Sequence, residues 1–84
     1  MTDKEIVTTV AETAHSMAGG NLNLKMIRKI SPGSNVWKVA CSTDDLETEF
    51  TLYVFPDASP EEVSAMTRER LILHLPRWQE TEAI

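Results

Sequence analysis

The chain has 84 residues, of which 42% are hydrophobic and 25% charged, and its formal net charge is −5. This composition is typical of one small folded domain, and a chain of this length buries a single core without room for a deep cleft. The negative charge disfavours a general binder of nucleic-acid backbones, and no segment approaches the roughly 20 apolar residues of a membrane span. We therefore expect one domain over residues 1–79, a frayed acidic tail over residues 80–84 and no membrane contact.

The first predicted element is a helix over Thr2–Ala18. Its apolar residues recur at spacings of three and four and form one stripe, which comprises Ile6, Val7, Val10, Ala11, Ala14, Met17 and Ala18. Thr2 and Glu5 have the spacing of a capping box. The two glycines at 19–20 are expected to end the helix, because glycine adopts the left-handed cap conformation without steric cost.

Two strands are predicted next, over residues 22–30 and 36–42, joined by a turn in SPGSN at 31–35. Strict alternation divides the first strand into two faces, one with Leu22, Leu24, Met26 and Ile30, the other with Asn23, Lys25, Ile27 and Lys29. In the second strand, alternation places Trp37, Val39 and Cys41 on one side. The sequence thus predicts an antiparallel hairpin with one apolar face.

A third strand over residues 47–55 directs Phe50, Leu52 and Val54 toward the core. Ser59 and Glu62 then form a second capping box, with Pro60 at the first helical position. The helix is expected to reach about Leu75. We assign one of its faces to Val63, Met66, Arg70 and Leu73, and a wider apolar band to Leu71, Ile72 and Leu75.

The predicted fold class is α+β, in the order α-β-β-β-α, with a three-stranded antiparallel meander and both helices packed on one face. This order resembles the double-stranded-RNA-binding domain. The second helix of that family opens with a cluster of lysines that meets phosphate, whereas this helix opens with SPEEVSAM, where Glu61 and Glu62 would repel phosphate. The resemblance implies the architecture and, as an alternative function, a divergent nucleic-acid-binding domain that uses the lysines of the hairpin and the aromatic residues of the sheet.

The residues that carry chemistry do not form a catalytic pattern. Cys41 is the single cysteine, so no internal disulfide is possible, and its apolar strand predicts a buried, inert thiol in a reducing compartment, by default the cytoplasm. A minor enzyme would need His15 or His74 as a base near Cys41. We predict no catalytic residue and no cofactor. We also predict no metal site, because the acidic residues are divided between a loop and a strand.

The surface offers three candidate binding features. Seven carboxylates lie within residues 44–62 along the edge of the sheet, where they either discourage pairing of exposed edges or match a basic protein surface. The uncovered sheet face is expected to present an apolar and basic set, namely Lys25, Ile27, Lys29, Val36, Lys38, Ala40, Glu49, Thr51, Tyr53 and Phe55. Trp78 either folds back over the core or forms, with Leu75, the contact of a homodimer.

The predicted function is a small acidic protein-interaction module without enzymatic activity, such as an inhibitor or adaptor. Small acidic inhibitors of phage and mobile elements are analogous in size and charge. The partner would be a protein with a basic or mixed surface, and nucleic acid remains the alternative. The predicted partner-binding residues are Glu47, Glu49, Tyr53, Phe55, Asp57, Glu61 and Trp78.

Overall fold

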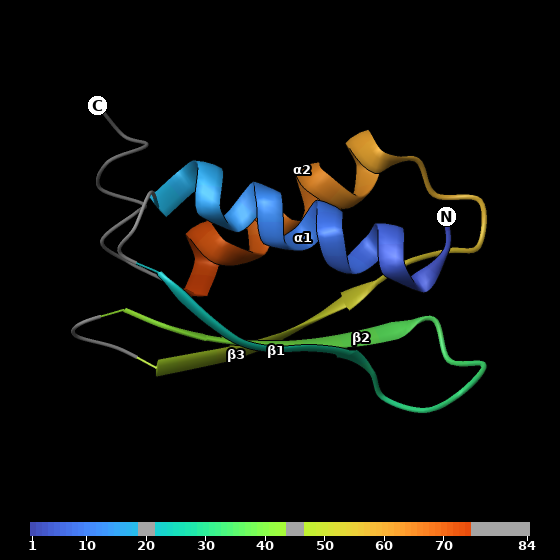
Figure 1. Ribbon diagram of the computed structural model, residues 1–84, viewed down its shortest axis with the longest axis horizontal. Coiled ribbons are helices and arrows are strands. Elements are labelled where there is room, and N and C mark those ends of the chain that lie inside the picture. Colours follow the sequence, from blue (N-terminus) through green and yellow to red (C-terminus); the bar gives the residue numbers. More distant parts are fainter. Residues whose placement is uncertain (19–21, 44–46, 75–84) are drawn as a thin grey trace.

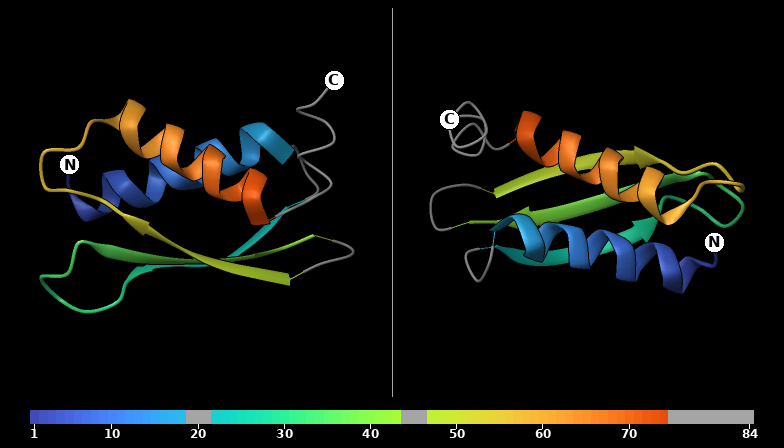
Figure 2. Two further views of the ribbon diagram at one scale, coloured as in Figure 1. Left: turned by 180° about the vertical axis from the view of Figure 1, so that it is seen from behind. Right: turned by 90° about the horizontal axis from the view of Figure 1, so that it is seen from above.

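The fold is a two-layer arrangement of one sheet and two helices. The computed structural model describes residues 1–18, 22–43 and 47–74, which form helix α1 (Asp3–Ala18), strands β1 (Asn23–Lys29), β2 (Val36–Ser42) and β3 (Glu47–Tyr53), and helix α2 (Pro60–His74). The strands pair antiparallel in the order β1-β2-β3. Both helices lie on the same side of the sheet, as Figures 1 and 2 show. The predicted α+β meander is confirmed.

Helix α1 begins with the predicted capping box. The Glu5 amide donates to Thr2 Oγ1 over 3.2 Å, and the Thr2 amide donates to Glu5 Oε1 over 2.9 Å. The hydrogen bond from the Thr2 backbone amide, followed by a hydrogen bond from the Thr2 side chain, lowers the pKa of the Glu5 carboxyl. The apolar stripe is buried at Ile6, Val10 and Ala14. The glycines predicted to end this helix lie outside the described residues.

Strand β1 contains a bulge that the alternation pattern does not predict. Leu24 pairs with Cys41 and Met26 with Ala40, so that Lys25 is an extra residue opposite β2. After the bulge the two faces exchange, because two residues of one strand oppose a single residue of the other. Ile27 consequently pairs with Val39 on the side that the helices cover.

This exchange corrects the faces predicted for β1. Ile27 and Lys29 were expected on the uncovered face, but both lie on the covered side, where Lys29 reaches Asp3 of α1. Met26 and Arg28 take their places on the uncovered face. Strict alternation was therefore wrong for the second half of this strand and right for β2 and β3, which pair without a break from Val36 and Tyr53 to Ser42 and Glu47.

Strand β3 ends at Tyr53, two residues before the predicted end. Tyr53 pairs with Val36, the first residue of β2, so there is no partner strand beyond this point. The chain continues as a connection in which the Val54 amide donates to the Asn35 carbonyl over 2.8 Å. The predicted core positions Phe50, Leu52 and Val54 are all buried.

Helix α2 has the predicted cap but a partly different buried face. The Glu62 amide donates to Ser59 Oγ over 3.2 Å. The buried residues are Val63, Thr67 and Leu71, whereas two residues of the predicted face, Arg70 and Leu73, are exposed. The prediction was right for Val63 and Leu71, which are buried, and for Met66, which packs against the core. It missed Thr67, because counting apolar residues leaves out a buried threonine.

Thr67 is fully buried although its side chain is polar. Its hydroxyl donates to the Val63 carbonyl over 2.8 Å, which satisfies the polar group inside its own helix and leaves the methyl group for packing. The hydroxyls of Thr13 and Ser64 form a hydrogen bond of 2.9 Å between α1 and α2. Small polar residues therefore form part of the contact between the helices.

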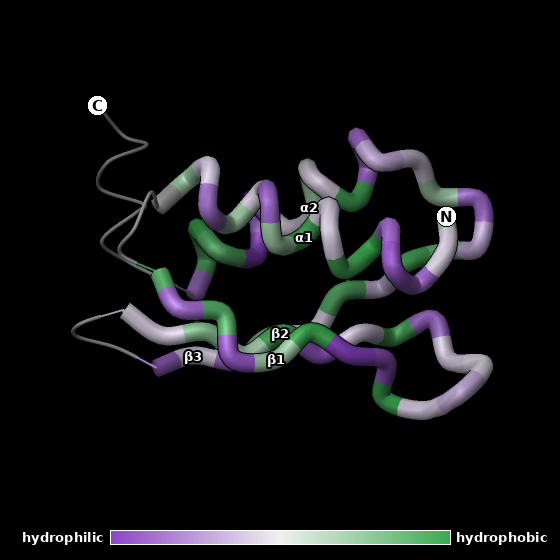
Figure 3. The backbone as a smooth tube through the Cα atoms, viewed as in Figure 1, coloured by the Kyte–Doolittle hydropathy of each residue, from purple (hydrophilic) through white to green (hydrophobic). Residues whose placement is uncertain are grey.

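The core lies between the helices and the sheet. Figure 3 shows hydrophobic and hydrophilic residues alternating along the strands, as expected for a sheet covered on one side. Neither helix, within the ranges described, is long and apolar enough to cross a membrane. The predicted tail at 80–84 and the predicted contacts of Leu75 and Trp78 fall outside the described residues.

Candidate functional site

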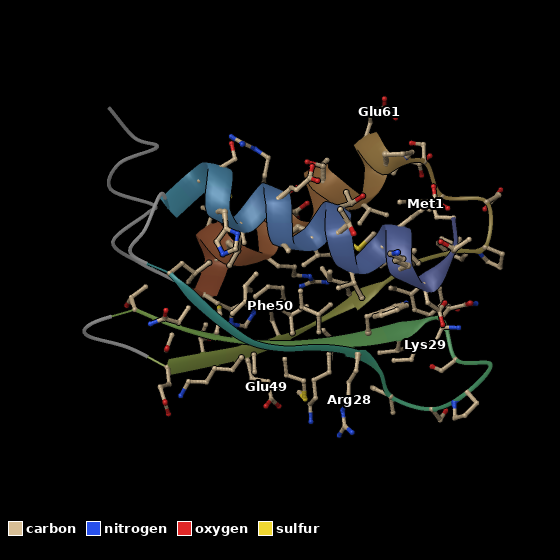
Figure 4. The ribbon with its side chains drawn as sticks, viewed as in Figure 1. Met1, Arg28, Lys29, Glu49, Phe50 and Glu61 are labelled. Carbon is tan, nitrogen blue, oxygen red and sulfur yellow. The ribbon has the colours of Figure 1, made fainter. Side chains whose placement is uncertain are left out.

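The candidate site is the sheet surface that the helices leave uncovered, called the open face below. The strand register places residues of all three strands on it. Strands β2 and β3 contribute every second side chain, and β1 contributes two neighbours at its bulge. Figure 4 shows Arg28 and Glu49 projecting away from the helices, whereas Lys29 lies on the helix side. The open face comprises Lys25, Met26, Arg28, Val36, Lys38, Ala40, Glu47, Glu49, Thr51 and Tyr53.

One end of the open face carries large exposed hydrophobic side chains. Ile30 is 54% exposed, Tyr53 47% and Phe55 58%. The rings of Tyr53 and Phe55 meet edge to face, with centroids 4.7 Å apart. Val36 lies beside them, since it pairs with Tyr53 and accepts a hydrogen bond from the Ile30 amide. We call these four residues the apolar end.

The other end of the open face is charged, and its charges are paired. Lys38 Nζ lies 3.0 Å from Glu49 Oε1, and Lys25 forms an ion pair with Glu47 across the width of the sheet. The hydrogen bond from Lys25, together with its positive charge, lowers the pKa of Glu47. Two carboxylates of the expected acidic edge, Glu47 and Glu49, are thus each paired with a lysine, whereas Asp44 and Asp45 lie outside the described residues.

The bulge in β1 changes which residues of this strand join the open face. Lys25, the bulged residue, stays on the same face as Glu47, and the shift after it adds Arg28 to that face, opposite Lys38. Arg28 is exposed and forms no ion pair within the described part of the chain. The open face therefore combines one unpaired cation, two ion pairs and an apolar end.

The structure brings together four of the seven residues predicted to bind a partner. Glu47, Glu49 and Tyr53 lie on the open face, and Phe55 borders it. Asp57 is in the connection after β3, and Glu61 is in the first turn of α2. Figure 4 shows Glu61 and Glu49 on opposite sides of the molecule, so these carboxylates do not form one acidic surface. Trp78 lies outside the described residues.

Three residues of this surface were missed by the prediction. Met26 and Ile30 were assigned to the core face, and Arg28 to no face, because alternation was carried through the strand without a bulge. A cue was present in the sequence: Met26 and Ile27 are adjacent apolar residues, which a regular half-buried strand would separate.

The covered side holds the groups that could in principle be reactive. Cys41 is 1% exposed, and burial raises the pKa of its thiol, which keeps the sulfur protonated. His74 stacks on Phe50, with ring centroids 5.7 Å apart. Within residues 1–18, 22–43 and 47–74, no three His, Cys, Asp or Glu side chains are grouped so that they could hold a metal ion.

Comparison with known proteins adds no family to this description. No family model matches the chain, and neither the curated proteins nor the solved structures contain a significant match.

Proposed function

We propose that the protein is a small interaction module without enzymatic activity, and that another protein docks on the open face of the sheet. The observation that carries the proposal is the apolar end, where three large side chains are about half exposed on a surface that neither helix covers. Protein interfaces commonly place aromatic and aliphatic anchors beside a polar rim. On the open face the ion pairs and Arg28 supply such a rim.

The proposed partner has a mixed surface rather than a strongly basic one. Glu47 and Glu49 are already paired with lysines, so a basic partner would have to compete with Lys25 and Lys38. A partner that offers an apolar group to Tyr53 and alternating charges to the rim fits without breaking these pairs. An inhibitor or an adaptor would suit such a surface, and the free buried thiol of Cys41 supports a place in the cytoplasm.

Single-stranded nucleic acid is a second candidate, favoured by one specific observation. The bulge puts Arg28 on the same face as Tyr53, and aromatic residues beside cations on an open sheet can stack bases and contact phosphates. The two carboxylates of the ion pairs oppose this function, since they would repel a phosphate backbone. We therefore favour a protein partner.

The proposal is tested by affinity capture with paired variants. Tyr53→Ser together with Phe55→Ser removes the anchors, and Leu73→Ser is a matched control, because Leu73 is 55% exposed but lies on α2. We expect the double variant to lose the captured protein and the control to retain it, with unchanged far-ultraviolet circular dichroism for both. Capture that persists in the double variant would contradict the proposal.

Two further arms define the partner. Nuclease treatment before capture should leave the bound protein in place, whereas loss of binding after nuclease would favour nucleic acid. Exchanging the charges of one ion pair, Lys38→Glu with Glu49→Lys, preserves the pair but reverses its direction on the sheet. We expect this exchange to weaken binding of a mixed-charge partner without destabilising the domain.

A further inference from the structure

The two edges of the sheet differ in how readily each can pair with another strand. The edge of β1 is interrupted by the bulge at Lys25, and a bulge discourages further pairing. Strand β3 pairs with β2 without interruption from Glu47 to Tyr53 and contains neither proline nor glycine. Among the described residues, no strand pairs with the outer side of β3. The outer edge of β3 is therefore the one that can accept another strand.

One hydrogen bond shows which backbone groups of β3 point outward. The Val54 amide donates to the Asn35 carbonyl, which continues the register of β3 and β2 by one position. In an antiparallel ladder, pairs that exchange hydrogen bonds alternate with pairs that do not. Phe50 and Leu52 therefore direct their N–H and C=O groups toward β2. The alternate residues direct theirs to the free edge, and these are Glu47, Glu49, Thr51 and Tyr53.

The carboxylates beside this edge are already balanced by lysines. Charges on an edge strand normally discourage pairing with another strand. Here Glu49 Oε1 lies 3.0 Å from Lys38 Nζ, and Glu47 is paired with Lys25. Both carboxylates are thus drawn across the open face toward lysines of their own sheet. A second strand would meet less repulsion at this edge than the sequence of β3 suggests.

Charge and length select one way in which two copies of β3 can pair. A two-fold axis perpendicular to the sheet runs the two strands antiparallel and keeps the helices of both copies on one side. An axis through Glu49 would place two carboxylates directly opposite each other, which is unfavourable. An axis through Phe50 places Glu47 opposite Tyr53 of the second copy, and Glu49 opposite Thr51 of the second copy. Only this register pairs the whole length of β3.

An exposed apolar side chain of α2 lies near the same edge. Figure 2 shows α2 above β3 and α1 above β1, and Ser64 of α2 contacts α1. At about 100° per residue, Leu73 lies on the side of α2 opposite Ser64, which is the side away from α1. Leu73 is 55% exposed, and the next residue, His74, stacks on Phe50, through which the axis passes. A second copy would therefore bury apolar surface at Leu73.

We propose that two copies of the chain associate through their β3 edges and form one continuous antiparallel sheet, with Phe50 at the two-fold axis. The outward amides and carbonyls of each β3 supply the hydrogen bonds, and the ion pairs of each copy stay intact. The contact uses the edge of the sheet rather than its surface, so the open face of each copy stays uncovered. The dimer therefore does not depend on the proposed partner.

The test measures amide hydrogen exchange along β3 of the full chain, from micromolar to millimolar protein. The amides of Glu49, Thr51 and Tyr53 should exchange roughly tenfold more slowly at the high concentration, because pairing protects them from water. Those of Phe50 and Leu52 are bonded to β2 and should be slow throughout. Sedimentation velocity over the same range should show the mass doubling.

The free edge of β1 supplies an internal control. The Ile30 amide donates to the Val36 carbonyl, so the amide of the preceding residue, Lys29, points away from β2. Its exchange rate should not depend on protein concentration, because the bulged edge of β1 takes no part in the dimer.

Variants at Thr51 test the register. Thr51→Pro removes an outward N–H that β2 does not use, which an edge strand tolerates, and should prevent association. Thr51→Glu faces Lys38 within its own copy but Glu49 of the second copy, so it should fold normally and weaken association roughly tenfold. Thr51→Lys should strengthen association. If the proline variant does not fold, the comparison of glutamate with lysine still decides the register.

The proposed dimer would be ruled out by outward amides whose exchange does not depend on concentration, by a monomer at millimolar protein, or by equal association of Thr51→Glu and Thr51→Lys. Leu73→Ser, the control for partner capture, should weaken the dimer severalfold and still retain the captured protein. The two proposals therefore fail separately, since exchange along β3 is measured without any partner.

Discussion

The two faces of the sheet are built from the same three strands but serve different ends. On the covered face, Val39, Phe50 and Leu52 are at most 4% exposed and form the core with the helices. On the open face, ion pairs and half-exposed aromatic residues alternate with those core positions. The difference shows that a sheet covered on one side separates the residues needed for stability from those available for binding.

The largest expected difference between the faces is in thiol accessibility. Cys41 on the covered face should react with a thiol reagent only after unfolding, on the order of a thousandfold more slowly than in denaturant if stability is near the usual lower limit. Thr51→Cys in a Cys41→Ala background places the thiol on the open face and should react at once. Equal rates for the two thiols would contradict the assignment of the faces.

The buried thiol of Cys41 should also make the free energy of unfolding depend on pH. Burial raises the pKa of Cys41 above that of the unfolded chain, so the unfolded state loses its proton first as pH rises. Stability should therefore be unaffected below the unfolded pKa and should fall as pH rises from that value toward the folded pKa. Cys41→Ala should remove this part of the alkaline loss, measured by urea unfolding at several pH values.

The next largest difference between the faces is the stability cost of alanine substitution at two neighbouring residues of β3. Leu52 is 1% exposed on the covered face, and Leu52→Ala should lower the free energy of unfolding by about 2–5 kcal/mol through lost burial and the cavity left behind. Thr51→Ala changes the adjacent position on the open face and should stay within about 0.5 kcal/mol. Chemical denaturation measures both, and similar losses would mean that the faces are not distinct.

A smaller effect concerns the helices that cover one face. The hydrogen bond between Thr13 and Ser64 joins α1 to α2. A double-mutant cycle with Thr13→Val and Ser64→Ala should give a coupling free energy of about 0.5–1.5 kcal/mol. Additive losses, within experimental error, would show that the contact between the helices depends on packing alone.

The smallest effect concerns the ion pair between Lys25 and Glu47 on the open face. Lys25→Met should raise the pKa of Glu47 toward its ordinary value, which a nuclear magnetic resonance titration measures. Because the folded pKa is lowered, the contribution of the pair is present above the unfolded pKa and is lost as pH falls through the folded value. Lys38→Met, which breaks the neighbouring pair, is the control and should leave the pKa of Glu47 nearly unchanged.

Local chemistry made much of the fold predictable. The capping residues Thr2 and Ser59 act within four residues of chain, and both form the expected hydrogen bonds. The core positions of β2 and β3 followed from alternation, because these strands pair without interruption. The candidate site was predictable to the same extent: Glu47, Glu49, Tyr53 and Phe55 were identified from a regular strand.

The remaining features depend on contacts between distant residues. The bulge at Lys25 is a property of the pairing between β1 and β2, and it alone decides that Arg28 belongs to the open face and Lys29 to the covered side. The buried face of α2 depends on its packing against α1 and β3, and the buried Thr67 is accommodated by a hydrogen bond within its own helix.

The sequence by itself determined the order of the elements, their caps and the alternation of the regular strands, because these follow from interactions between residues a few positions apart. Only the tertiary structure decided which charges pair across the sheet, that Glu61 lies on the opposite side from Glu49, and that the Trp37 indole faces no acceptor. Such features arise when segments far apart in the chain meet, and a short-range pattern carries no information about that meeting.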